Sequence, residues 1–178
     1  MEKEVKWVLD PVHSEILFKV KHLMITNIKG EFRKVQGEMI TNGSDFNQAA
    51  IQITIDTSSV YTNDETRDGH LRSADFFEVA KFKEIAFKST SFKKLEPDNY
   101  HLSGLLTIKG ISKEVGLAVE FGGINKDPWG QEKAGFSVAG TINRKDWGLN
   151  WNTVLETGGV LVGEEVKISA EVQFIRKG

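Results

Sequence analysis

The stretch VKISAEVQF, residues 166–174, decides the fold class. Its apolar residues occupy every second position, and polar residues fill the positions between them. Successive side chains of a β-strand point to opposite faces, whereas a helix would scatter this pattern around its circumference. The stretch is therefore predicted to be a strand with one face against an apolar interior and the other in water.

The same period of two recurs along most of the chain. Further runs are Ile16-Phe18-Val20, Ile51-Ile53-Ile55, Ile85-Phe87, Tyr100-Leu102-Gly104-Leu106-Ile108, Val115-Leu117-Val119-Phe121, Phe136-Val138-Gly140-Ile142 and a weaker one over 35–41. Together they make about eight strands, the number at which a closed barrel can first hold one small ligand. Turn residues such as Asn42-Gly43 separate the runs and favour hairpins. We predict a mainly β, antiparallel barrel that forms a single domain over residues 1–178.

Residues 62–80 interrupt the alternation. The segment is charged, and Thr62 followed three residues later by Glu65 is typical of a helix N-terminus. We expect short helices here, with Phe76 and Phe77 closing one end of the barrel.

Residues 145–159 form a second irregular segment. They contain Trp147, Trp151 and the pair Gly158-Gly159, which is typical of a turn. This segment is predicted to cap a barrel end as well. Neither segment contains a linker or a repeat that would indicate a second domain.

Composition excludes several classes of function. The net charge of −2 arises from 23 basic and 25 acidic residues spread along the chain, so no basic stripe is available for nucleic acid. The absence of cysteine excludes disulfides, thiolate nucleophiles and sulfur-ligated metals. No apolar run reaches the roughly 18 residues of a membrane span, and no signal-peptide pattern follows Met1. We expect a soluble, cytoplasmic protein without stable membrane insertion; a chain trimmed of a leader would instead be periplasmic.

From Trp7 to Phe174 the chain resembles the polyisoprenoid-binding YceI-like family. The resemblance rests on ordered blocks, namely Asp10-Pro11-Val12-His13-Ser14, Lys21-His22-Leu23, Gly30-Glu31-Phe32, Thr62-Asn63 with Arg67-Asp68-Gly69-His70-Leu71 and Ser73-Ala74-Asp75-Phe76-Phe77, residues 104–113, Ile142-Asn143-Arg144-Lys145-Asp146-Trp147-Gly148 and Val162-Gly163-Glu164-Glu165-Val166. It implies a lipocalin-like, eight-stranded antiparallel barrel whose lumen takes an isoprenoid chain or another long amphiphile, with no catalytic activity. Many members are periplasmic, and the resemblance leaves a homodimer open.

A ligand in the lumen would contact the inward apolar side chains of the strands and the aromatic residues of the two caps. These candidates are Ile16, Phe18, Val20, Ile53, Ile55, Phe76, Phe77, Ile85, Phe87, Leu106, Ile108, Val119, Phe121, Phe136, Val138, Ile142, Trp147 and Trp151. Each buried methylene of a guest contributes about 0.8 kcal/mol, so a long chain can bind tightly. The alternative is that these side chains fill the barrel themselves, as in other small barrels. Small residues such as Gly104, Ala134 and Gly140 leave room if they cluster.

Three charged or polar residues in the first cap, Arg67, Asp68 and His70, are candidates for contact with a polar head group such as a pyrophosphate or a quinone. The alternative is an internal salt bridge. The sequence contains no His-x-His or His-Glu-x-x-His pair, so no metal site is predicted. An Arg144–Asp146 pair is expected to fix the turn after the seventh strand.

The sequence therefore favours a binding protein that carries or stores a long-chain isoprenoid, an isoprenoid quinone or a fatty amphiphile, with no catalytic residue and no resident cofactor. Two alternatives stay open. One is an enzyme acting on the isoprenoid head group, with His70 and Asp68 as acid and base. The other is a stress-response interaction module with a filled barrel and a large apolar surface patch.

Overall fold

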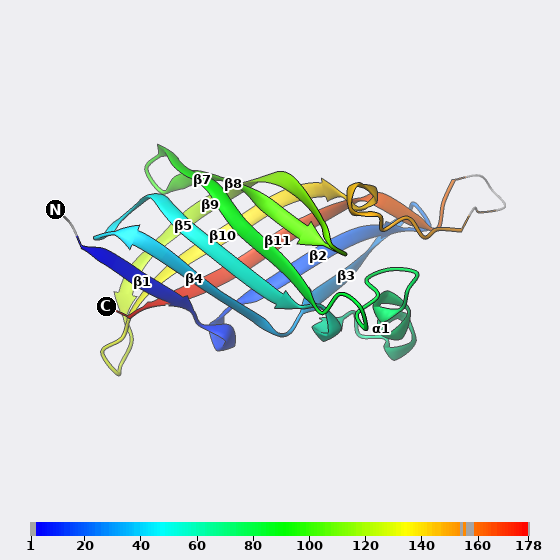
Figure 1. Ribbon diagram of the computed structural model, residues 1–178, viewed down its shortest axis with the longest axis horizontal. Helices are drawn as coiled ribbons and strands as arrows, with labels where there is room; N and C mark the ends of the chain where they lie inside the picture. Colours follow the sequence, from blue (N-terminus) through cyan, green and yellow to red (C-terminus); the bar gives the residue numbers. More distant parts are fainter. Residues whose placement is uncertain (1–2, 154, 156–158, 178) are drawn as a thin grey trace.

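The computed structural model describes residues 3–153, 155 and 159–177 and consists mainly of β-strands (Figure 1). The strands are β1 (Glu4–Leu9), β2 (Glu15–His22), β3 (Thr26–Phe32), β4 (Val35–Asn42), β5 (Asp45–Asp56), β6 (Val60–Tyr61), β7 (Glu84–Glu96), β8 (Asn99–Ile108), β9 (Ile111–Lys126), β10 (Glu132–Asn143) and β11 (Val162–Arg176). The helices are the 3-10 turns η1 (Pro11–His13), η2 (Thr57–Ser59) and η3 (Arg144–Trp147) and the α-helix α1 (Glu65–Arg72).

These segments follow eight paths around a closed antiparallel barrel. Three of the paths consist of two successive strands each, namely β1 with β2, β3 with β4, and β5 with β6. In the first path, β1 and β2 both pair with β11. In the next two, β4 pairs with β1 and β5, and β3 pairs with β2 and β6. The pairing of β11 with β1 and β2 closes the sheet, which removes its exposed edges. The predicted eight-stranded barrel is confirmed.

The strand β1 was missing from the sequence-based prediction. Its residues Val5, Trp7 and Leu9 alternate and are buried, while Val8 on the outward face obscures the pattern. Trp7 is fully buried, and its indole N–H donates to Thr41 Oγ1 at 3.0 Å. Burial of so large a side chain with its polar atom satisfied fixes the start of the chain against the barrel.

Aromatic side chains fill one end of the barrel. Phe136 lies at their centre, with ring centroids 5.3 Å from Phe121 and 5.4 Å from Phe46. Phe46 in turn contacts Trp7 at 5.3 Å. We call this group, completed by Phe92, Tyr100 and Phe174, the aromatic plug. These packed rings belong to the buried core and fill the interior at this end.

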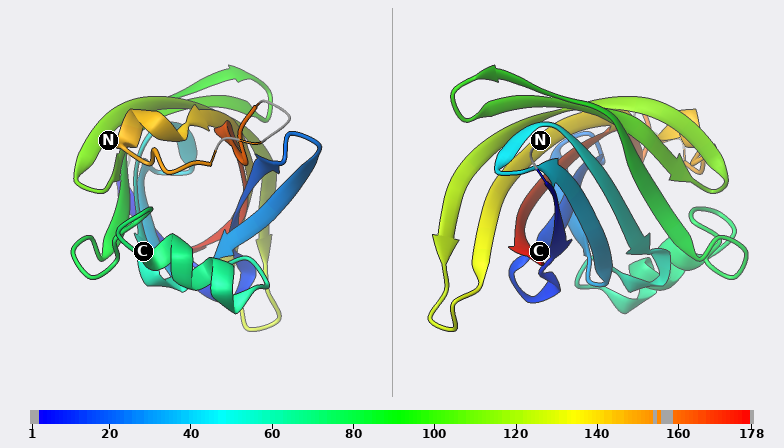
Figure 2. Two further views of the ribbon diagram at one scale, coloured as in Figure 1. Left: turned by 90° about the vertical axis from the view of Figure 1, so that its right-hand side faces the viewer. Right: turned by 60° about the vertical axis from the view of Figure 1, so that its left-hand side comes forward.

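The opposite end carries α1 and η3 (Figures 1 and 2). One α-helix forms in the first cap, and residues 73–82 continue it as hydrogen-bonded turns. The predicted N-cap at Thr62 is wrong: Asp64 caps α1 by accepting from the N–H of Arg67 at 3.1 Å. No helix of the described residues is long and apolar enough to cross a bilayer.

Candidate ligand-binding cavity

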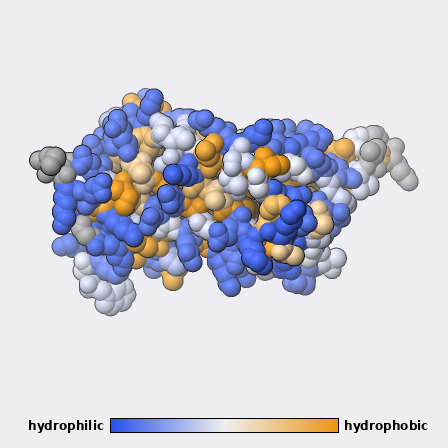
Figure 3. Space-filling view, in the orientation of Figure 1, coloured by the Kyte–Doolittle hydropathy of each residue, from blue (hydrophilic) through white to orange (hydrophobic). Residues whose placement is uncertain are grey.

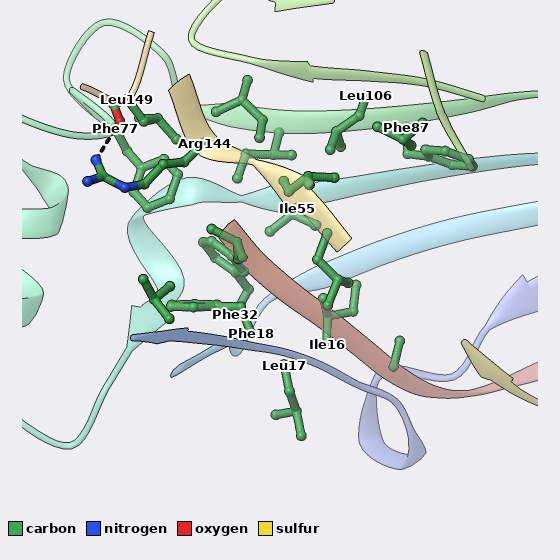
Figure 4. A pocket seen from close by; sticks show the side chains of 18 of the residues that line it. Ile16, Leu17, Phe18, Phe32, Ile55, Phe77, Phe87, Leu106, Arg144 and Leu149 are labelled. Carbon is green, nitrogen blue, oxygen red and sulfur yellow. Dashed lines mark hydrogen bonds between the residues drawn. The ribbon is translucent and has the colours of Figure 1, made fainter. Parts of the chain in front are cut away.

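The barrel encloses a cavity of about 590 Å³ between the aromatic plug and the end that carries α1. This volume lies within the range of pockets that hold small apolar ligands. Strand side chains make its wall, and Figure 4 shows Ile16, Phe18 and Phe32 on one side facing Ile55 and Leu106 on the other. Phe92, Phe136 and Phe174 of the plug form its floor. The lumen is therefore hollow, contrary to the alternative of a barrel filled by its own side chains.

The structure places most of the predicted lumen residues on this cavity. They are Ile16, Phe18, Val20, Ile53, Ile55, Phe76, Phe77, Ile85, Phe87, Leu106, Ile108, Val119, Phe136, Val138, Ile142 and Trp151. Two of the predicted residues do not line it. Phe121 packs in the plug against Phe46 and Phe136, and Trp147 is buried beside the cavity, where its indole N–H donates to the carbonyl oxygen of Leu106 at 2.8 Å.

Other wall residues were missed, although the sequence contained their signal. The stretch 166–174 contributes all of its alternating apolar residues to the cavity, namely Val166, Ile168, Ala170, Val172 and Phe174. Val115 and Leu117 of β9 also line it. Each of these residues lies in a predicted period-two run. Assigning the whole apolar face of every run to the lumen would therefore have identified them. Met39 lies in the weaker run over 35–41, whereas Leu9 and Leu149 lie outside the runs and carried no such signal.

Four glycines leave space for large side chains of the lumen. A Cβ added at Gly30 would lie 2.1 Å from Cζ of Phe18, and one added at Gly140 would lie 2.3 Å from Cδ2 of Leu117. Gly37 and Gly104 are covered in the same way by Ile53 and Phe87. All four covering side chains line the cavity. Because these rings and branches lie against bare backbone, they take less of the space along the barrel axis.

The two caps meet across the mouth of the cavity. The ring of His70, on α1, lies edge-on to Trp151 at a centroid distance of 4.6 Å, and Phe76 contacts both rings at 5.2 and 5.4 Å. We call these three residues the lid cluster. Trp151 belongs to the segment after η3, whose described residues 149–153 and 159–161 we call the strap. The left view of Figure 2 shows α1, the strap and the β2–β3 hairpin around this end of the barrel. Gly158, predicted to form a turn here, lies outside the described residues.

The polar residues that line the cavity lie at this mouth. They are Lys21, His22, Thr62, Asp64, Thr66, Arg67, His70 and Arg144. The floor and the wall in between are apolar. The cavity is therefore a one-ended apolar pocket with a polar rim, the shape complementary to a molecule that has an apolar tail and a polar head.

The structure separates the three predicted head-group residues. Asp68 is 2% exposed and does not line the cavity, because its Oδ1 accepts from both the N–H and the hydroxyl of Thr62. Arg67 does reach the rim and donates to Thr62 Oγ1 at 2.8 Å and to the Thr62 carbonyl at 2.7 Å. His70 reaches the rim too, and its Nε2 lies 2.8 Å from Asp75 Oδ2. The postulated salt bridge within the cluster is replaced by bonds through Thr62, and His70 pairs with Asp75 rather than Asp68.

Arg144 is a buried cation at the mouth, 3% exposed. Its guanidinium donates at 2.6 to 3.2 Å to four backbone carbonyls, those of Leu149, Trp151, Val162 and Gly163. These bonds join the strap to β11, and Asp146 is not the partner that the sequence suggested. In the described part of the chain Arg144 makes no salt bridge. Burial lowers the pKa of Arg144, and the charge of Glu164 opposes that effect.

Metal ligation finds no support in the described side chains. No group of three or more His, Asp or Glu lies close enough there to hold an ion. His13 bonds Asp10 through its Nδ1 at 2.8 Å, and its side chain is about half exposed.

Comparisons with known proteins converge on one family. Residues 7–174 match the model of the YceI-like domain. A UPF0312 protein of Staphylococcus epidermidis is 41% identical over 170 residues, which cover 95% of this chain and 96% of that protein. A YceI protein of Campylobacter jejuni has a TM-score of 0.74 at 32% identity, covering 89% of this chain and 90% of its own. A polyisoprenoid-binding domain from Saccharophagus degradans shares the fold, with a TM-score of 0.69 at 14% identity over 96% of this chain and 98% of that one.

Proposed function

This chain belongs to the YceI-like domain family, and from that membership we propose that its barrel carries or stores a long-chain isoprenoid, an isoprenoid quinone or a fatty amphiphile without changing it chemically. The observation that carries the proposal is the one-ended apolar cavity of about 590 Å³. The fold shared with a polyisoprenoid-binding domain supports the isoprenoid as the first class of guest to test.

The geometry favours a guest that enters tail first. Each methylene that leaves water for the apolar wall contributes about 0.8 kcal/mol, so affinity grows with chain length until the tail reaches the aromatic plug. The wall offers no pattern of hydrogen-bonding groups, so we expect several tails of similar length and width to bind. A branched isoprenoid suits the mixture of rings and branched aliphatic side chains on the wall.

The head group is proposed to rest at the polar rim. Arg67 and His70 keep this role from the sequence-based hypothesis, and Arg144 is added to them because it is a buried cation without a carboxylate partner in the described chain. An acceptor-rich head, such as a quinone, a carboxylate or a phosphate, would offset the desolvation of that guanidinium. Asp68 is withdrawn from this role, since Thr62 occupies its carboxylate.

The enzymatic alternative loses its proposed acid and base pair in this geometry. Asp68 is buried away from the cavity, and His70 contacts Asp75 on the outer side of the mouth. A general acid and base must both reach the reacting group within hydrogen-bond distance or through one water. Reversible enclosure without chemistry therefore fits the arrangement better, with no cofactor beyond the guest itself.

The proposal is tested by filling the cavity from a single position. Ala170 lines the cavity, whereas its neighbour Ser169 is exposed on the outer face of the same strand. Both Ala170→Phe and Ser169→Phe add an aromatic ring, but only the first adds it to the lumen. In titrations with geranylgeraniol we expect Ala170→Phe to weaken binding at least tenfold and Ser169→Phe to leave it unchanged. Equal affinity of both variants, or no binding by the unmodified protein, would refute the proposal.

A further inference from the structure

Three consecutive apolar residues are exposed at the turn between β2 and β3. Leu23, Met24 and Ile25 have exposed fractions of 39, 51 and 73%. The other exposed large apolar residues in the described chain are separate from one another in sequence, namely Val12, Leu95, Leu105, Ile111, Ile124 and Trp129. Much of the outer face in Figure 3 is hydrophilic, with isolated hydrophobic spots. We call the run Leu23-Met24-Ile25 the apolar tip.

Turn chemistry does not explain the apolar tip. Leu23 and Met24 have φ angles of 54 and 62°, in the left-handed region that Gly, Asn and Asp adopt most readily. Two backbone bonds hold this conformation, from Leu23 N–H to the Leu161 carbonyl at 2.8 Å and from Ile25 N–H to the His22 carbonyl at 3.2 Å. The turn therefore keeps bulky apolar side chains in solvent on a backbone that does not favour them. A partner for those side chains would account for both features.

The apolar tip adjoins the mouth of the cavity. Lys21 and His22, immediately before it, line the cavity, as does Leu161, the strap residue to which the tip is bonded. In the left view of Figure 2 the β2–β3 hairpin lies at the same end of the barrel as the strap and α1. A surface that contacts the tip is thus next to the route by which a guest enters.

Positive charge flanks the apolar tip. Residues 16–30 contain Lys19, Lys21 and Lys29 and no acidic residue. All three lysines are exposed, and none forms a salt bridge within the described part of the chain. Of the acidic residues on the neighbouring β11, Glu164 is bound to Lys145 at 2.8 Å. Apolar side chains bordered by cations suit the boundary between anionic head groups and acyl chains of a bilayer.

We propose that the apolar tip docks the mouth of the barrel onto the surface of a lipid bilayer that contains anionic lipid. The inference rests on the proposed function, because a long-chain amphiphile partitions into membranes and is scarce in water. With the tip inserted, a guest passes between the bilayer and the cavity without exposing its tail to bulk water. The strands stay outside the bilayer, so the contact is peripheral and reversible.

The test uses vesicles of phosphatidylcholine with and without phosphatidylglycerol, separated from free protein by sedimentation. The variant Met24→Ser/Ile25→Ser removes the tip. Its matched control, Leu95→Ser/Trp129→Ser, removes two residues of similar exposure, 66 and 84%, from the end of β7 and from the β9–β10 turn. We expect the tip variant to bind anionic vesicles at least about tenfold more weakly, which is the loss for one buried apolar side chain, and the control to bind like the unmodified protein. Added salt should weaken the binding.

Two further measurements separate the possible failures. Affinity for geranylgeraniol in solution should be the same in the tip variant, while extraction of that guest from vesicles should slow with vesicle binding. The inference would be overturned if the unmodified protein did not bind vesicles, or if the control pair lost as much vesicle binding as the tip variant. Either result would leave the proposed function standing. Failure to bind geranylgeraniol in solution would defeat the proposed function instead. A dimer that the tip variant dissociates, without any vesicle binding, would assign the tip to a second copy and overturn the inference as well.

Discussion

Replacement of Gly30 by alanine is expected to shorten the guest that the cavity accepts. The added Cβ would lie 2.1 Å from Cζ of Phe18, whereas ordinary contacts begin at 3.4 Å, so the ring must move by at least 1.3 Å. The three atoms nearest to that Cβ all belong to the Phe18 ring, and this ring lines the cavity. The backbone behind Gly30 blocks movement outward, and Phe32, at a centroid distance of 5.6 Å, restricts one lateral direction. The ring therefore moves toward the lumen.

The size of the effect follows from the tail that the ring displaces. Exclusion of about two methylene groups costs about 1.6 kcal/mol, which corresponds to about fifteenfold in Kd. A series of prenyl alcohols of increasing length, titrated by displacement of a fluorescent apolar probe, reads this directly. Short alcohols should bind Gly30→Ala as they bind the unmodified protein, and the longest alcohol that fits should lose most of its advantage.

A matched control is Gly135→Ala, where an added Cβ meets no atom within 4 Å. This variant should bind the whole series normally. The reasoning is refuted if Gly30→Ala, with an unchanged melting temperature, binds every chain length as the unmodified protein does, or if Gly135→Ala shows the same dependence on length.

Three other predictions address the lid, the folded state and the first cap. Trp151→Ala removes one ring of the lid cluster, so stopped-flow exchange should show faster dissociation of a bound guest, at least threefold, with a smaller change in the equilibrium affinity. Burial alone raises the pKa of Asp10, but hydrogen bonds from Lys133, His13 and the Val12 N–H outweigh it and lower that pKa from 3.8 to about 2. The lowered pKa stabilises the fold above pH 4, and this stability is lost as the pH falls toward 2, so Asp10→Asn should reduce the free energy of unfolding in urea by about 2 kcal/mol at pH 7 and much less near pH 2. Asp68→Ala leaves the buried Thr62 groups without their acceptor and should lower the free energy of unfolding by about 1–3 kcal/mol, whereas the exposed Asp75→Ala should change it little.

The barrel was predictable because its strands keep the period of two. The alternating apolar residues from Val166 to Phe174 in β11, which fix the fold class, all line the cavity, and the turns between the runs fall where Gly, Asn and Asp predicted them. The N-cap was less certain, since Thr62 and Asp64 are both good capping residues two positions apart. In the structure Asp68 binds Thr62, which leaves Asp64 to cap α1.

The residue pattern alone could not predict that the lumen is hollow. Whether the lumen is hollow depends on which large side chain covers which glycine, as Phe18 covers Gly30, and that requires the pairing of strands. The register between β9 and β10 shifts at Gly135/Phe136, and Phe121 lies opposite Phe136 in the plug rather than on the cavity wall. Successive residues of a helix differ by about 100° in direction, so Arg67 and Asp68 cannot both face the mouth. Arg144 was missed because its carbonyl partners come from the irregular strap.

The most direct test of a lipid-like guest is extraction of the purified protein with organic solvent, followed by mass spectrometry, for both the unmodified chain and Ala170→Phe. The expression host should be rich in isoprenoid quinones, and the protein should be purified without detergent. We predict a long-chain amphiphile near one equivalent per unmodified barrel and a much smaller amount from the variant with the filled cavity. An empty extract from stably folded, unmodified protein, or the same amount of lipid from both, would contradict the account.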